Sequence, residues 1–238
     1  MSLIQSNMSM SEVVEAHTSL IPVINRLGIR LGLKDKSVRE VCHEYGLDAD
    51  FVLIIINTFL NEEYFPEKRL KAFHLSLIVD YLNKTNQYYL RYQIPNVSRH
   101  LDLFIQHSTS DNHTLKLIGK FFHNFKEQLT SQIQYDEQVW FPYCLSTITE
   151  EGNHPCLEIA EGKIRKEDDN TEALLADLKS IMIKHLSGDY NENLCYAVLF
   201  AITTLEKDIK QHNRIRERIL GQMVQKMEKT NQTNQITE

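Results

Sequence analysis

The chain has 238 residues, of which 42% are hydrophobic, so it carries enough apolar material for a folded core and wholesale disorder is excluded. It contains only eight glycines and five prolines, a composition that favours long helices over a turn-rich sheet fold. The net charge of −6 argues against a dedicated nucleic-acid binder, because binding phosphates requires a basic excess.

The N-terminal quarter is predicted to form a compact helical unit. Residues 1–10 read as a flexible leader, and residues 11–62 as a small three-helix domain. Ser11 is the expected cap of a first helix that runs to about residue 27. The capping-box pattern Ser37–Glu40 predicts the start of the second helix, and Asp48 the start of the third.

Four longer amphipathic helices are predicted over residues 69–228, with apolar residues at alternating spacings of three and four. Pro95 should kink or end the first, Pro142 should end the second, residues 150–163 read as a crossover loop, and residues 229–238 as a disordered tail. The predicted core stripes are Leu75, Ile78, Leu82, Asn86, Tyr89; Leu115, Ile118, Phe122, Phe125, Leu129, Gln132, Asp136, Trp140; Thr171, Leu174, Leu178, Ile181; and Val198, Ile202, Leu205, Ile209, His212, Arg216, Ile219, Met223. Such stripes predict an all-α fold with a four-helix bundle.

Polar residues interrupt two of these stripes. Gln132 and Asp136 are four residues apart on the second long helix, and His212 and Arg216 are four apart on the fourth. Side chains at this spacing project side by side on a helix. Di-metal carboxylate bundles build their sites from inward-facing pairs of this kind.

Two segments resemble the hemerythrin-like family. The run from Ser131 to Pro142 is similar to the pattern H-x-x-x-E-E-x-x-L/V-F-P, and the run from Asp208 to Arg216 is similar to D-L-x-x-H-x-x-x-E. Residues 20–60 resemble the small N-terminal domain of the repair-of-iron-centres (ScdA-like) family. The resemblance implies a hemerythrin-like four-helix bundle and a background of iron-sulfur repair and nitrosative or oxidative stress.

The resemblance also implies a di-iron site of four histidines and two carboxylates, most of which this sequence lacks. The first histidine position falls at Asn86, or at Gln87, and the second at Gln132. The third falls at Asp168, or at Glu167. The fourth histidine is His212, and the two carboxylate positions hold Asp136 and Arg216. Amides are poor iron ligands and a guanidinium is none, so no cofactor is expected. The paired cysteines of the family's N-terminal domain are also absent near residues 30–33.

Two interpretations of these polar residues remain open. In one, Arg216 replaces the cations and pairs with Asp136, with Asp168 as a further candidate partner, inside a hydrogen-bonded polar core completed by Asn86, Gln132 and His212. In the other, the stripes shift by one residue and Asp136 and Arg216 are solvated surface charges.

A basic cluster is the second candidate site. It comprises Arg26, Arg30, Lys34, Lys36 and Arg39, which could contact a partner or DNA or form an ordinary solvated face. The helices expected after residues 37 and 48 also have the spacing of a helix-turn-helix motif.

The four cysteines, Cys42, Cys144, Cys156 and Cys195, are scattered and form no C-x-x-C pair, as expected of reduced thiols in the cytoplasm. No signal-peptide pattern or bilayer-length apolar run is evident, so a membrane partner is not expected.

The leading hypothesis for function is a divergent hemerythrin-like protein without a complete di-iron site. It would be a non-enzymatic sensing, regulatory or protein-binding protein, with a protein partner or a second copy of itself. The first alternative is an iron-binding repair or stress protein with a remodelled site at Asp136, Asp168 and His212. The second is a DNA-associated regulator that uses the basic cluster.

Overall fold

The computed structural model describes residues 2–108, 113–148 and 170–236. These residues are overwhelmingly helical and contain no β-strand, which confirms the predicted all-α class. The only extended pairing among them is an isolated bridge between Ser9 and Ser37. No helix in the described ranges is both long and apolar enough to cross a bilayer.

The N-terminal unit contains more and shorter helices than predicted. They are α1 (Met10–Ala16), a 3-10 turn (Thr18–Leu20), α2 (Ile21–Arg26), α3 (Val38–Glu44) and α4 (Ala49–Leu60). The expected single helix over residues 11–27 is therefore wrong. The chain leaves the helical conformation at His17, whose φ and ψ are −137° and 70°. A new helix then starts with Pro22 in its first turn, where the missing N–H of proline costs nothing.

The flexible leader is a second incorrect prediction, because residues 4–9 are held by specific hydrogen bonds. The Ile4 N–H donates to Asn57 Oδ1 at 2.7 Å, and Asn57 Nδ2 donates back to the Ile4 carbonyl at 3.0 Å. Ser9, rather than Ser11, caps α1. The segment before α1 is thus an integral part of the N-terminal unit.

The other predicted helix starts are confirmed. Ser37 and Glu40 form a reciprocal capping box at the start of α3, with the Ser37 N–H donating to Glu40 at 2.7 Å. Asp48 caps α4 by accepting the Phe51 N–H at 2.9 Å. Local sequence signals were sufficient at both positions.

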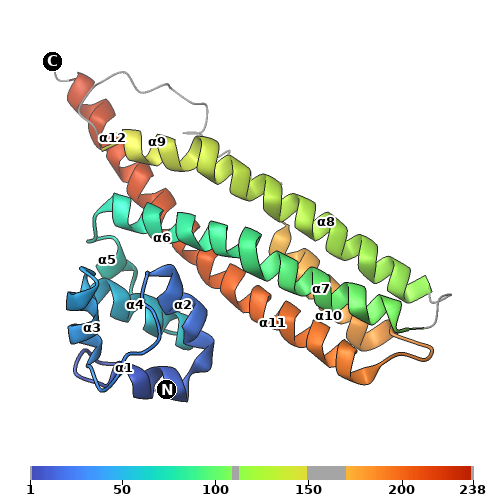
Figure 1. Cartoon of the computed structure of the whole chain (residues 1–238). Coiled ribbons are helices and arrows are strands. Elements are labelled where there is room, and N and C mark those ends of the chain that lie inside the picture. Colours follow the sequence, from blue (N-terminus) through green and yellow to red (C-terminus); the bar gives the residue numbers. More distant parts are fainter. Residues whose placement is uncertain (1, 109–112, 149–169, 237–238) are drawn as a thin grey trace.

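Long helical rods form the rest of the molecule (Figure 1). After the short α5 (Glu67–Leu70), they are α6 (Leu75–Tyr88) with α7 (Ile94–Gln106), α8 (His113–Tyr135) with α9 (Phe141–Ser146), α10 (Thr171–His185), and α11 (Glu192–Ile215) with α12 (Gln222–Ile236). Helix α10 packs on α8 and α11, and α7 packs on α11. This helical bundle is compatible with the predicted four-helix arrangement. The N-terminal unit lies against the α6 and α11 side of the bundle (Figure 1).

Three rods contain a π-helical turn where the helix continues. These turns are Tyr89–Gln93, Asp136–Trp140 and Arg216–Gly221. The first two stand just before Pro95 and Pro142. A proline ring clashes with the carbonyl four residues back, and a widened turn relieves that clash. Pro142 therefore does not end the second rod as predicted; α9 continues to Ser146.

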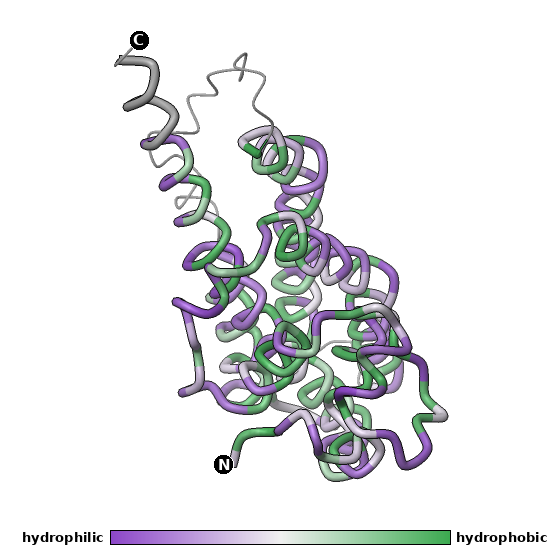
Figure 2. The backbone as a smooth tube through the Cα atoms, turned by 90° about the vertical axis from the view of Figure 1, so that its left-hand side faces the viewer, coloured by the Kyte–Doolittle hydropathy of each residue, from purple (hydrophilic) through white to green (hydrophobic). Residues whose placement is uncertain are grey.

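The buried apolar residues form two clusters. One joins the N-terminal unit to the end of the bundle formed by α6, α9 and α12, and it includes Phe51, Leu82, Trp140 and Ile219. The other fills the far end of the bundle. In Figure 2, hydrophobic and hydrophilic stretches alternate along the helices, as expected for rods with one buried face. The N-terminal unit thus shares a core with the bundle.

Two further predicted segments are the C-terminal tail and the crossover loop between the second and third long helices. Helix α12 continues to Ile236 and so extends over most of the tail that was predicted, from residue 229, to be disordered. The whole of the predicted crossover loop, residues 150–163, and the candidate residue Asp168 lie outside the described residues.

Candidate functional site: a buried ion-pair layer

Asp136 and Arg216 form a buried bidentate ion pair. Arg216 Nε donates to Oδ1 and Oδ2 of Asp136 at 3.0 and 2.9 Å, and Nη2 donates to Oδ1 at 2.6 Å. The side chains are 1% exposed for Asp136 and 5% for Arg216. Each residue is the first of a π-helical turn, and each lies on the predicted core stripe of its helix. The alternative in which they are solvated surface charges is therefore wrong.

His212 lies one turn before Arg216 and is buried. Its ring meets the ring of Tyr89 edge-on, with centroids 5.7 Å apart. Nδ1 lies 3.4 Å from Asn213 Oδ1, whereas Nε2 has no hydrogen-bond partner within the described residues. Burial, followed by the positive charge of Arg216, lowers the pKa of His212 to about 3. His212 is consequently neutral at physiological pH.

The predicted polar core is only partly hydrogen-bonded. Asn86 is buried on α6, but neither polar atom of its side chain has a hydrogen-bond partner in the described ranges. Full hydrogen bonding of Asn86 was therefore a wrong prediction. Gln87, the alternative position, is half-buried and donates to Glu137 Oε1 at 2.5 Å. Gln132 is half-buried on α8.

A second buried ion pair was not predicted. Arg26 Nη1 of α2 donates to Asp208 Oδ1 of α11 at 2.9 Å, and the side chains are 2% and 6% exposed. The Tyr89 hydroxyl donates to the same Asp208 oxygen at 3.4 Å. The Arg26 guanidinium also lies 4.9 Å from the ring centroid of Tyr88. This cluster ties the N-terminal unit to the bundle.

Electrostatics around the second pair favour its charged state. Burial opposes a charge on Arg26, but the adjacent Asp208 outweighs it, so the pKa of Arg26 is raised above its ordinary value. Burial, and then the charge of Asp208, raises the pKa of Tyr89 well above its ordinary value. Tyr89 therefore remains a neutral hydrogen-bond donor. A sequence signal existed for Asp208, which lies four residues before His212 on the same helix face.

The donors brought together here do not fit a two-iron centre. Both oxygens of Asp136 already accept bonds from Arg216, whose fixed positive charge would repel a cation. Within the described residues, no three His, Cys, Asp or Glu side chains gather as a metal-binding group. Of the family ligand positions described, His212 alone carries an imidazole.

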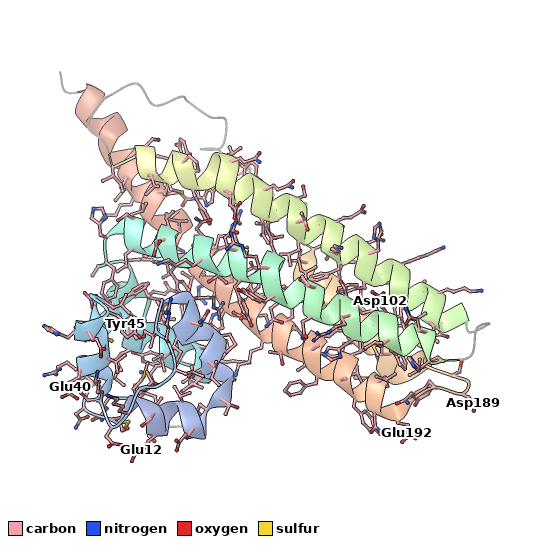
Figure 3. The ribbon with its side chains drawn as sticks, in the orientation of Figure 1. Glu12, Glu40, Tyr45, Asp102, Asp189 and Glu192 are labelled. Carbon is pink, nitrogen blue, oxygen red and sulfur yellow. The ribbon has the colours of Figure 1, made fainter. Side chains whose placement is uncertain are left out.

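The basic cluster is dispersed rather than joined. Arg26 is buried in its ion pair, so its assignment to a surface was wrong. Lys36 pairs with Glu44 at 2.5 Å, and Arg39 donates to Ser6 Oγ at 3.0 Å. Arg30 and Lys34 are exposed. Glu40 lies in the same unit (Figure 3), so acidic side chains dilute the positive charge of this face.

The helix-turn-helix interpretation also fails on burial. A recognition helix must expose one face to the major groove. Helix α4 is buried around most of its circumference, at Phe51, Val52, Ile54, Ile55, Ile56, Asn57, Thr58 and Phe59. It is the central helix of the N-terminal core and does not present a reading surface.

Comparisons with known proteins do not assign the chain to a family. No protein-family model matches the chain, and no match was found among curated proteins.

Proposed function

We propose that this chain is a divergent hemerythrin-like protein that works without a di-iron centre, as a non-enzymatic sensing or regulatory protein that binds a protein partner. The observation that carries the proposal is the Asp136–Arg216 pair. A guanidinium fork bound to the carboxylate supplies, from the protein itself, the positive charge that a buried carboxylate needs. The hemerythrin-like likeness still rests on the two sequence segments and the helical bundle.

The other buried charges support a structural rather than a chemical use. Asp208 is paired with Arg26, and Glu206 accepts from both Lys179 and Lys210. Catalytic acids and bases need a pKa near the working pH and access to substrate. None of these paired carboxylates is free to exchange a proton with a substrate.

The described thiols are likewise poor nucleophiles. Burial, with a smaller contribution from Asp48, raises the pKa of Cys42 to about 11. Burial and the neighbouring Asp136 raise the pKa of Cys144 well above its usual range. Because the thiolate is the reactive form, neither side chain suits thiol chemistry.

Metal analysis of the full chain tests the proposal. The protein is purified from iron-supplemented cells, its iron per chain is measured, and its thermal midpoint is compared with and without a chelator. We expect iron far below one atom per chain and an unchanged midpoint, because Arg216 fills the role of the cation. One or two iron atoms per chain, with destabilisation by the chelator, would overturn the proposal.

A mononuclear iron site at Asp136, Asp168 and His212 is the second candidate. It is favoured by one observation, the neutral His212 whose buried Nε2 has no partner among the described residues. In the same assay, this candidate requires near-stoichiometric iron that is lost in His212→Ala. The exposed His123 provides the control, and His123→Ala should leave the iron content unchanged.

A further inference from the structure

Two adjoining hollows lie along the line where α2 and the loop after it meet the first π-helical turn of the bundle. Both are lined by Tyr88 and Tyr92, and their volumes are about 360 and 430 Å³. The first hollow is completed by residues that include Pro22 and Leu31, and the second by residues that include Arg91 and Arg99. We call the two together the seam groove. Their size is at the lower end of the range for ligand sites.

One half of the seam groove is apolar and preorganised. Leu31 and Tyr92 are each 61% exposed, a large value for side chains of this type. The Tyr92 ring lies 5.9 Å from that of Tyr88. Tyr88 is itself fixed, because its hydroxyl accepts from Gln93 Nε2 at 2.6 Å and Arg26 lies over its ring. Exposed aromatic side chains held in place are the usual anchors of protein interfaces.

The other half is positively charged. Arg91 and Arg99 line the second hollow, and none of the residues that line either hollow is acidic. Arg91 and Arg99 are both exposed, and Arg99 Nη2 donates to Asn96 Oδ1 at 3.2 Å. In a chain of net charge −6, this is a local reversal of sign. Arginine forks bind carboxylates bidentately.

We propose that the seam groove binds an extended acidic segment of a partner protein. An apolar side chain of that segment packs against Leu31 and Tyr92, and its Asp or Glu residues pair with Arg91 and Arg99. This inference rests on the proposed partner-binding function and specifies its surface. The apolar half of the groove and the overall negative charge favour such a peptide over a nucleic acid, whose long polyanion the rest of the molecule would repel.

Fluorescence anisotropy with the full chain tests the inference. The probe is a panel of labelled hexapeptides with one or two apolar residues flanked by Asp and Glu. Matched panels carry Lys in place of the acids, or Ser in place of the apolar residues. We expect the acidic-apolar panel to bind, both matched panels to bind at least about tenfold more weakly, and affinity to fall with added salt.

Variants locate the site on the surface. Tyr92→Ala and Arg91→Glu should each weaken binding by about tenfold or more. Tyr196, which is 62% exposed on α11, and the exposed Arg39 provide matched controls, and Tyr196→Ala and Arg39→Glu should change affinity less than about twofold. All four positions are exposed, and circular dichroism checks that the variants fold.

Several results would overturn the inference. They are no binding by any member of the acidic-apolar panel, equal binding of the Lys panel or of a single-stranded oligonucleotide, equal losses in the control variants, or a self-dimer that Tyr92→Ala dissolves. The iron content of the same preparation separates the two proposals. Low iron with a groove that binds nothing removes the seam-groove inference alone, whereas stoichiometric iron removes the proposed function.

Discussion

Replacing Arg216 by methionine should destabilise the protein severely. The substitution keeps much of the side-chain volume but removes all three N–H···O contacts of 2.6–3.0 Å to Asp136. The carboxylate, which is 1% exposed, would then be buried without its counter-charge. Breaking a buried pair in this way costs about 3–5 kcal/mol of the free energy of unfolding. Total stabilities are commonly about 5–15 kcal/mol, so the loss is a large share.

Urea unfolding followed by circular dichroism at pH 7 measures this loss. The exposed pair Lys84–Asp80, 2.7 Å apart with side chains about half exposed, is the control, and Lys84→Met should cost less than about 1 kcal/mol. The double variant Asp136→Leu/Arg216→Met should recover most of the stability, because no charge is left unpaired. A loss below about 1 kcal/mol for Arg216→Met alone would refute a buried ion pair that replaces a metal.

Two further predictions concern the neighbouring groups. Arg26→Met should cost about 3–5 kcal/mol by the same measurement and speed hydrogen exchange in α1–α4, because Asp208 loses its partner, whereas the exposed Arg30→Met should stay within about 0.5 kcal/mol of wild type. His212 has a pKa of about 3 when folded and 6.5 when unfolded, so the unfolded chain binds a proton that the folded chain rejects, and stability is lost as the pH falls below 6.5. Wild type should lose about 2 kcal/mol more than His212→Leu between pH 7 and pH 5, and equal losses in urea unfolding would contradict the neutral buried imidazole.

The first ion pair could be predicted from the sequence because helical periodicity places residues on faces. Asp136 and Arg216 each continue an apolar stripe, and a charge in such a stripe must be buried with a partner. Only the packing of the second rod against the fourth had to be assumed. The hydrogen bonding of Asn86 was not predictable in this way, because a stripe gives burial but not the distance to the next polar atom.

The second ion pair could not be predicted because it depends on how the N-terminal unit docks. Arg26 ends a two-turn helix, and nothing in its local sequence says which surface the helix meets. Its neighbours Arg30 and Lys34 are exposed, and grouping Arg26 with them led to the incorrect prediction that Arg26 lies on the surface. The break before α2 did have a signal, because Pro22 lies in the middle of the predicted helix and belongs in a first turn.

Prolines in the rods were interpreted too strongly as helix ends. Pro95 and Pro142 each follow a π-helical turn in which the N–H just before the proline bonds five residues back, from Ile94 to Tyr89 and from Phe141 to Asp136. The widened turn accommodates the ring, and the rod continues. The local patterns Gln-Ile-Pro and Trp-Phe-Pro after these turns were visible in the sequence. The sequence alone does not show which backbone carbonyl each N–H contacts, so these patterns do not by themselves distinguish a widened turn from a helix end.

The two ion pairs together explain why α11 and the turn after it hold the molecule in one arrangement. Asp208 binds α2 on one side and Arg216 binds the second rod on the other, two turns further along. Buried ion pairs add little net stability compared with apolar packing. A shift in the register of α11 would, however, leave Asp208 and Arg216 buried without their partners, at a cost of several kcal/mol each. Lys207, over the ring of Phe59, adds a further contact to the N-terminal unit. The seam groove therefore has walls fixed relative to each other, which reduces the entropy lost when a peptide binds.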